Sequence, residues 1–154
     1  MPNLISPIIT GEALDDYEQS VLDACGEHHF KPFMTLFFRP YSRGELVNLK
    51  PKIIGIKLYP AGITTQSQDG VRDFDAIQET VAAMEELGIP LLVHGESNGF
   101  VMNREKEFLD TYRELAVNFP RLHIIMEHIT TADSIEFLNK YPHISATVTI
   151  HHLM

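Results

Sequence analysis

The sequence predicts an α/β fold in which parallel strands alternate with helices. Short apolar runs over residues 52–59, 90–96 and 122–128 are separated by segments whose apolar residues recur at helical spacing. Strands that alternate with helices at a regular spacing are typical of βα units and a parallel sheet. The 154 residues are 44% hydrophobic, which is enough for one substantial core, so we expect a single domain over residues 1–154.

Composition and charge exclude several classes of partner. The chain has 21 acidic and 12 basic side chains, a formal net charge of −9 that disfavours binding to nucleic acid. Its one cysteine, Cys25, excludes an internal disulfide and fits a reducing compartment. No apolar run approaches the roughly 20 residues of a membrane span, and the first residues do not look like a signal peptide. We therefore expect a cytoplasmic protein without a membrane partner.

The first half of the chain contains one predicted helix and two predicted strands. Apolar residues at helical spacing predict a helix over roughly residues 11–24. The run 33–38 is interpreted as a buried strand, and residues 43–49 allow either a short helix or a turn. A second buried strand over about 52–59 ends at a proline and a glycine-containing loop.

The second half repeats the alternation of helix and strand. Gly88 can end one helix in a left-handed cap, and Pro120 stops another. Thr130 and Thr131 can cap a further helix. The predicted elements are helices with apolar faces over 74–87 and 108–119, and strands over 90–96, 122–128 and 144–150.

Lys57, His94 and His128 each lie at the carboxyl end of a predicted strand. In barrels and open α/β sheets alike, active sites are built at that end. Strand alternation further predicts that His128 shares a face with Ile124 and Met126, so that its imidazole lies above an apolar column.

Two interpretations of these side chains stay open at this point. A single histidine at a strand end is more often structural, but two at one level favour a metal site, since imidazole is a common zinc ligand. Burial lowers the pKa of a lysine, and the neutral amine of Lys57 can then react with carbon dioxide to give a carbamate able to bridge two metal ions. The alternative for Lys57 is an ion pair with Glu96 or Glu127.

Several motifs, taken in order, resemble the amidohydrolase superfamily and, within it, the single-function bacterial type of dihydroorotase. Residues 57–61 with Thr64 and Thr65 resemble the strand of a carboxylated lysine and its substrate loop. Segments 91–96 and 126–131 resemble two metal-histidine strands. The opening Met-Pro-Asn-Leu resembles the end of the second barrel strand, and residues 146–154 resemble the start of the seventh strand region.

The resemblance implies a (β/α)₈ TIM barrel with two divalent metal ions, usually zinc, of which this chain covers roughly strands 3 to 7. It implies that Lys57, as a carbamate, bridges both ions, and that His94 and His128 bind the second one. The substrate-binding residues that it implies are Asn3, Thr64 and Thr65.

The implied reaction is the reversible hydrolysis of dihydroorotate to N-carbamoyl-L-aspartate in pyrimidine biosynthesis, by a hydroxide that bridges the two ions. The partner is then this small-molecule substrate, and a homodimer is compatible with the resemblance. The alternatives are a non-catalytic barrel segment that acts as an assembly partner, or another cyclic-amide hydrolase such as a hydantoinase. Thr64, Thr65 and the Met-Pro-Asn opening favour dihydroorotase over the latter.

Two parts of the family pattern are absent from the sequence. The His-x-His pair that binds the first metal does not occur, and neither does the late aspartate that acts in catalysis. A complete barrel of this type has about 250 residues. We therefore expect an internal fragment of a dihydroorotase that contains no catalytic residue and is inactive by itself.

Overall fold

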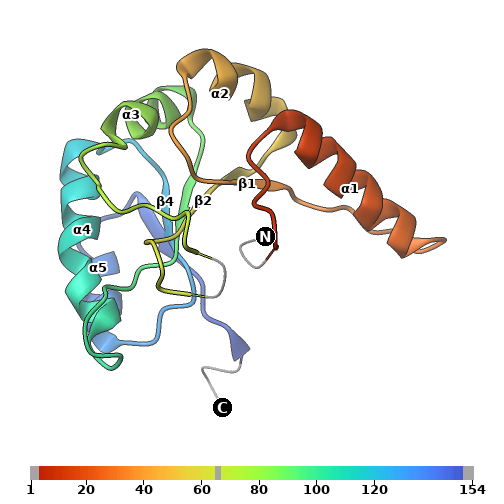
Figure 1. Cartoon of the computed structure of the whole chain (residues 1–154). Coiled ribbons are helices and arrows are strands. Elements are labelled where there is room, and N and C mark those ends of the chain that lie inside the picture. Colours follow the sequence, from red (N-terminus) through yellow and green to blue (C-terminus); the bar gives the residue numbers. More distant parts are fainter. Residues whose placement is uncertain (1–3, 65–66, 151–154) are drawn as a thin grey trace.

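Five parallel strands form one sheet in this computed structural model, and their order in the sheet is their order in the chain (Figure 1). The structure describes residues 4–64 and 67–150. The parallel α/β architecture predicted from the sequence is confirmed. The strands are β1 (Thr35–Phe37), β2 (Gly55–Leu58), β3 (Leu91–Val93), β4 (Ile124–Met126) and β5 (Ile144–Ala146).

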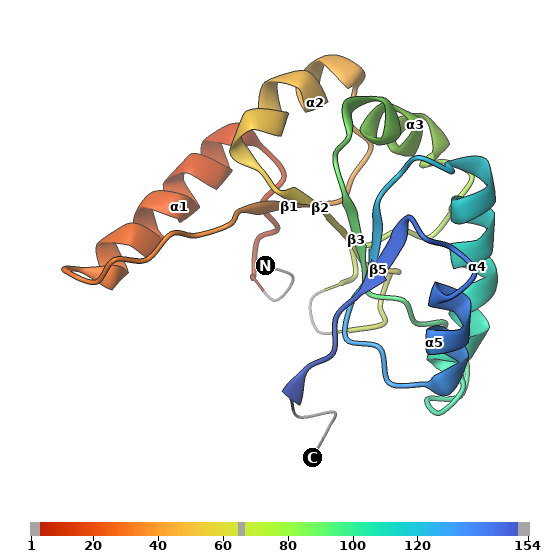
Figure 2. The same ribbon diagram turned by 180° about the vertical axis from the view of Figure 1, so that it is seen from behind.

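The helices between the strands cover one face of the curved sheet (Figures 1 and 2). They are α2 (Arg43–Leu49), the 3₁₀ helix η1 (Lys50–Lys52), α3 (Gln78–Leu87), α4 (Arg104–Asn118) and α5 (Ala132–Leu138). In contrast, α1 (Gly11–Cys25) extends away from the sheet, and Leu14 is its buried residue. Within the described ranges, no helix has the length and apolar character needed to span a bilayer.

Strand register divides the sheet residues into two opposite faces. The face that the helices cover includes the buried row Leu36, Ile56, Leu91, Ile124 and Ile144. The adjacent row points the other way and consists of Phe37, Lys57, Leu92, Ile125 and Ser145. Leu92 and Ile125 are half-buried and Ser145 is exposed, so this second face is less covered than the first. Lys57 therefore belongs to the face that the helices leave open.

Local sequence signals explain where several helices begin and end. Thr131 caps the N-terminus of α5 by accepting a hydrogen bond from the backbone N–H of Ser134, as the sequence predicted. Gly88 ends α3 in the left-handed conformation, with φ 66°, which also confirms the prediction. Ser42 and Glu45 form a reciprocal capping box at α2, so residues 43–49 are a helix rather than a turn.

Several predicted element boundaries are wrong. The strand over 33–38 is shorter and Phe33 is 67% exposed, because pairing with β2 begins at Thr35. Ile54 is 48% exposed since it precedes the paired residues of β2. Helix α3 begins at Gln78 rather than at residue 74. The last strand ends at Ala146, the final residue paired with β4, rather than at residue 150.

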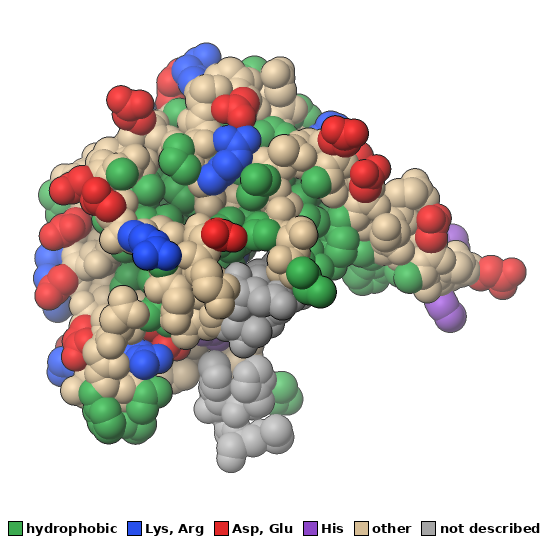
Figure 3. Space-filling view, viewed as in Figure 1, with side chains coloured by type: hydrophobic (Ala, Val, Ile, Leu, Met, Phe, Trp, Pro, Cys, Tyr) green, Lys and Arg blue, Asp and Glu red, His purple; other side chains and the backbone are tan. Residues whose placement is uncertain are grey.

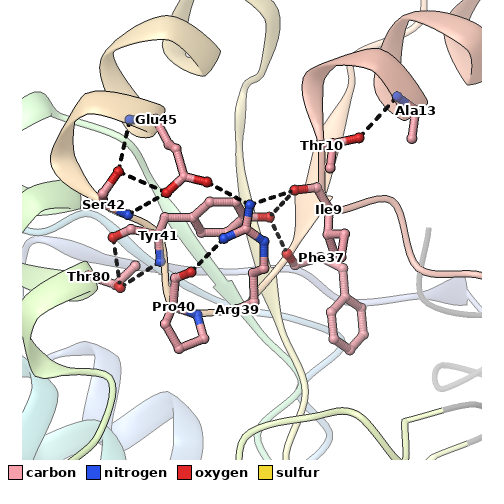
Figure 4. Close-up of polar contacts among 10 residues, drawn as sticks. All are labelled: Ile9, Thr10, Ala13, Phe37, Arg39, Pro40, Tyr41, Ser42, Glu45 and Thr80. Carbon is pink, nitrogen blue, oxygen red and sulfur yellow. Dashed lines mark hydrogen bonds and ion pairs between the residues drawn. The ribbon is translucent and has the colours of Figure 1, made fainter.

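A polar cluster fixes the connection between β1 and α2 (Figure 4). The Arg39 guanidinium lies over the Tyr41 ring, 4.1 Å from its centroid, and donates hydrogen bonds to Ile9 O and to Glu45 Oε1 at 2.8 Å. Tyr41 Oη donates to Phe37 O at 2.8 Å, and its backbone N–H donates to Thr80 Oγ1. The cluster thus joins the N-terminal segment, β1 and α3.

This cluster predicts a pH dependence of stability at the acid end. Hydrogen bonds from Arg39 and then from Ser42 lower the pKa of Glu45 from 4.5 to about 2. Because the folded-state pKa is depressed, the stabilisation is present above about pH 4.5 and is lost as the pH falls toward 2. We expect Glu45→Gln to lower the thermal midpoint at pH 7 and to flatten its fall between pH 4.5 and 2. Circular dichroism melts test this, with Glu136→Gln on exposed α5 surface as the matched control.

Acidic side chains are spread over the outer surface of the helices and along α1 (Figure 3). This distribution agrees with the net charge of −9. The face shown in Figure 3 has no continuous basic patch. That nucleic acid is not a partner stays a prediction from the net charge.

Candidate metal centre

The carboxyl ends of β2, β3 and β4 bring Lys57, His94 and His128 to one site. Nδ1 of His94 lies 2.8 Å from Nε2 of His128, and the ring centroids are 4.5 Å apart. The Tyr59 ring lies next to both Lys57 and His94: its centroid is 4.9 Å from Nζ of Lys57 and 5.8 Å from the centroid of the His94 ring. Three side chains that are far apart in the sequence therefore meet on the open face of the sheet.

Lys57 is buried, with 6% of its surface exposed, and its ammonium contacts the carboxylate of Glu127. Nζ also lies 4.9 Å from the centroid of the Tyr59 ring. Burial lowers the pKa of Lys57 from 10.5 to about 7. The ion pair anticipated from the sequence is thus formed with Glu127. Burial favours the neutral amine, which is the form that reacts with carbon dioxide, whereas the contact with the Glu127 carboxylate favours the ammonium.

His94 is held in place from two sides. Its ring stacks on Tyr59 with centroids 5.8 Å apart, and Tyr59 in turn stacks on Phe37. Its second ring nitrogen, Nε2, lies 3.4 Å from Glu96 Oε1. Desolvation, followed by the charges of His128 and Lys57, lowers the pKa of His94 to about 4. The imidazole is therefore neutral at neutral pH, as a metal ligand must be.

His128 reaches the site by a backbone conformation that strand alternation does not predict. Met126 lies on the face that the helices cover, so the predicted column of Ile124, Met126 and His128 is wrong. The strand ends at Met126, and His128 adopts φ 48° in the left-handed region. Its backbone N–H donates to Thr147 Oγ1 at 2.8 Å. This turn places the imidazole of His128 beside that of His94 on the open face.

The two imidazoles are candidate ligands for one metal ion. In a tetrahedral zinc site, two nitrogen ligands at about 2.05 Å from the ion lie roughly 3.3 Å apart, so the 2.8 Å between Nδ1 and Nε2 must open by about 0.5 Å. Among residues 4–64 and 67–150, no three His, Cys, Asp or Glu side chains form a group that could hold a metal. A carbamate on Lys57 would supply the third protein ligand.

Of the three predicted substrate-binding residues, the structure describes Thr64. Asn3 and Thr65 lie outside the described residues. Thr64 lies in the loop after β2, where its backbone N–H donates to Ser67 Oγ at 3.0 Å and its carbonyl accepts from the same hydroxyl. Ser67 is buried, so it anchors the part of this loop that the structure describes.

Sequence reasoning did not assign a role to Tyr59 or to Glu105. Tyr59 follows Lys57 by two residues, so strand alternation alone could have placed it on the same face. Glu105 lies in the first turn of α4 and binds the loop that follows His128. No spacing rule links a helical glutamate to a loop so distant in the sequence, and a structure was needed to find it.

Comparisons with known proteins identify relatives along the whole chain, although no family model matches it. The dihydroorotase of Helicobacter hepaticus is 42% identical over 158 residues, covering 99% of this chain and 46% of that protein. The dihydroorotase of Vibrio cholerae is 40% identical over 162 residues, covering 100% of this chain and 47% of that protein.

Solved structures of dihydroorotase and of related folds also match this chain. The crystal structure of dihydroorotase from Campylobacter jejuni matches with a TM-score of 0.97 and 51% identity, covering 100% of this chain and 46% of that one. The L-hydantoinase of Arthrobacter aurescens matches with a TM-score of 0.76 at 15% identity, covering 96% of this chain and 38% of that one, which shows a shared fold.

The five-stranded sheet corresponds to part of the TIM-barrel fold of the dihydroorotase and hydantoinase structures that it matches. Its five parallel strands correspond to a segment of those barrels. Along its whole length the chain is similar to dihydroorotases, and it spans about half the length of the relatives that it matches.

Proposed function

We propose that this chain carries the bridging-lysine side of a binuclear dihydroorotase centre, and that the protein that contains it interconverts dihydroorotate and N-carbamoyl-L-aspartate. The observation that carries the proposal is the pair of imidazoles, with Nδ1 of His94 2.8 Å from Nε2 of His128, at the same end of the sheet as the buried side chain of Lys57. Identity of 40% or more to dihydroorotases along the whole chain favours this substrate over other cyclic amides.

Lys57 is the residue that would become the bridge between two metal ions. Its neutral amine nitrogen adds to the carbon of carbon dioxide and loses one proton, which gives a carbamate with one negative charge. The Glu127 carboxylate, in contact with Nζ, or solvent can accept that proton. Conversion of the ammonium to a carbamate reverses the sign of the charge, so it also ends the ion pair with Glu127.

His94 and His128 would hold the second ion. Glu96, 3.4 Å from Nε2 of His94, favours a proton on that nitrogen and leaves the Nδ1 lone pair for the metal. When bound, two divalent ions, zinc in the resemblance, supply Lewis acidity toward the amide carbonyl of the substrate. Thr64, Thr65 and Asn3 are proposed to bind the substrate.

A chimera tests the proposed function directly. In it, this chain replaces the matching segment of the Campylobacter jejuni dihydroorotase, whose fold it shares at a TM-score of 0.97. We expect zinc-dependent hydrolysis of dihydroorotate by the chimera, and none of hydantoin at the same enzyme concentration. The isolated 154-residue chain, assayed in parallel, is expected to give no turnover, since it contains neither the His-x-His pair nor the late aspartate of the family.

Two outcomes would contradict the proposal. Preferential hydrolysis of hydantoin would reassign the substrate, and a folded but inactive chimera that binds no zinc would favour the non-catalytic alternative. His123→Ala is the matched control within the chimera, because His123 directly precedes β4, at the opposite end of the strand from His128, and its Nε2 contacts Ser145 Oγ at 2.9 Å. That variant is expected to keep its activity.

A further inference from the structure

Glu105 binds the loop between β4 and α5 through both of its carboxylate oxygens. Oε2 accepts hydrogen bonds from the backbone N–H of Thr130 at 2.9 Å and from its hydroxyl at 2.6 Å. Oε1 accepts from the backbone N–H of Thr131 at 3.1 Å and from its hydroxyl at 2.7 Å. The hydroxyl of Ser134, in the first turn of α5, also donates to Oε1. One side chain of α4 therefore fixes the whole start of α5.

The segment that Glu105 fixes begins two residues after His128. The left-handed backbone of His128, at φ 48°, is unfavourable for a residue other than glycine, so neighbouring contacts must hold it. On one side, Thr147 does so, because its hydroxyl accepts from the His128 N–H and its carbonyl accepts from the Ile129 N–H at 3.0 Å. On the other side, the contacts of Glu105 fix Thr130 and Thr131.

The negative charge on Glu105 suits it to accept these hydrogen bonds. Partial burial alone would raise its pKa, but the hydrogen bonds from Ser134, Thr130 and Thr131 outweigh the desolvation and lower the pKa below its ordinary value. The side chain therefore stays ionised at neutral pH. An ionised carboxylate is a stronger acceptor than a neutral amide, and it can accept from five donors at once only because it has no proton of its own.

We propose that Glu105 is a positioning residue that holds the left-handed turn at His128 and thereby aims the His128 imidazole at His94. The consequence for metal binding rests on the proposed function, whereas the consequence for the two imidazoles does not. Glu105 acts through the loop and does not itself contact a metal or substrate.

The first test uses the metal-free chain with ¹⁵N-labelled histidine. In Glu105→Gln the amide nitrogen cannot accept a hydrogen bond, so about half of the acceptor capacity at the loop is lost. We expect the imidazole ¹⁵N resonances of His94 and His128 to shift toward those of separated rings, while the resonances of His123 stay unchanged. Glu114→Gln, on the exposed surface of the same helix, is the control and is expected to leave all histidine signals in place.

Unchanged His94 and His128 resonances in Glu105→Gln would overturn the proposal, even if the thermal midpoint fell, because a purely structural role predicts only the latter. Thr130→Val is the second variant, since it removes one 2.6 Å contact to Glu105 and keeps the shape of the side chain. It is expected to shift the same resonances by less. A folded Thr130→Val chain with wild-type histidine signals would also contradict the proposal.

Co²⁺ titration, in the presence of bicarbonate, then measures the effect on metal affinity. We expect Glu105→Gln to weaken Co²⁺ binding by about 10-fold, the lower end of the 10–100-fold range typical of residues that orient metal ligands. If the wild-type chain binds Co²⁺ no better than a His94→Ala/His128→Ala chain, the metal part of the proposed function fails. The imidazole resonances still decide the role of Glu105 in that case.

Discussion

Replacing Lys57 by alanine in the chimera is expected to lower dihydroorotate turnover by at least about 10³-fold. Removal of a single preorganised polar group from an active site typically costs 10²–10³-fold, and here the loss also removes the bridge between two metal ions. The row that contains Lys57 otherwise consists of Phe37, Leu92, Ile125 and Ser145, none of which can form a carbamate. Steady-state assays at saturating zinc and bicarbonate measure the effect.

Glu127→Gln is the control that separates the two roles of Lys57. If the lysine acts only as the partner of Glu127, both variants should lose stability and activity to similar extents. If Lys57 acts as a carbamate, Glu127→Gln should keep most of the turnover of the chimera. Incubation with ¹³C-bicarbonate above pH 7 should add one carbamate carbon signal to the wild-type protein and none to Lys57→Ala. Comparable turnover in wild type and Lys57→Ala would refute the carbamate role.

Replacing Gly95 by alanine is expected to destabilise the chain by about 3 kcal/mol or more. A Cβ at this position would lie 2.5 Å from Cε2 and 2.7 Å from Cζ of Tyr112, distances that force a displacement. The Tyr112 ring cannot move cheaply, because it is 1% exposed and packs against Phe108 and Phe137. Its hydroxyl also donates to Val93 O at 3.2 Å. Overpacking of a well-packed core typically costs 1–3 kcal/mol and occasionally more.

Urea denaturation of the metal-free chain measures this change in the free energy of unfolding. Gly44→Ala is the matched control, since a Cβ there meets no atom within 4 Å and the residue lies inside α2. It is expected to be neutral or slightly stabilising, because alanine favours a helix over glycine by up to about 1 kcal/mol. A Gly95→Ala chain as stable as Gly44→Ala would show that the Tyr112 ring yields more easily than its contacts indicate.

The architecture could be predicted because the sequence shows two patterns, apolar residues at helical spacing and short apolar runs typical of buried strands. The apolar residues of α4, Phe108, Tyr112 and Leu115, recur at helical spacing and are buried as expected. Strand runs such as Leu91–Val93 are continuous and apolar, the pattern typical of parallel strands that are covered on both faces. Polar side chains at three strand ends were then enough to locate the candidate site, since the carboxyl ends of parallel strands lie at one edge.

The predictions that were wrong, and the residue that was missed, depend on single backbone conformations and on long-range contacts. The turn at His128 reverses the face on which its side chain lies, and nothing in the residues around it requires a positive φ. The exposure of Phe33 depends on where pairing with β2 begins, a matter of register that composition does not set. Glu105 and its partners belong to different βα units, so only packing of α4 against the β4–α5 loop brings them together.

The order of the strands has a consequence for local opening of the native state. The candidate centre uses β2, β3 and β4, which are the interior strands of the five, while β1 and β5 form the two edges in the sheet as described. Edge strands have backbone groups paired on one side only, and such regions open at lower free energy than the interior. Amide hydrogen exchange should therefore be fastest in β1 and β5 and slowest in β2–β4. Opening of either edge strand would leave β2, β3 and β4 paired with one another, so the candidate site at their carboxyl ends should persist when β1 or β5 opens.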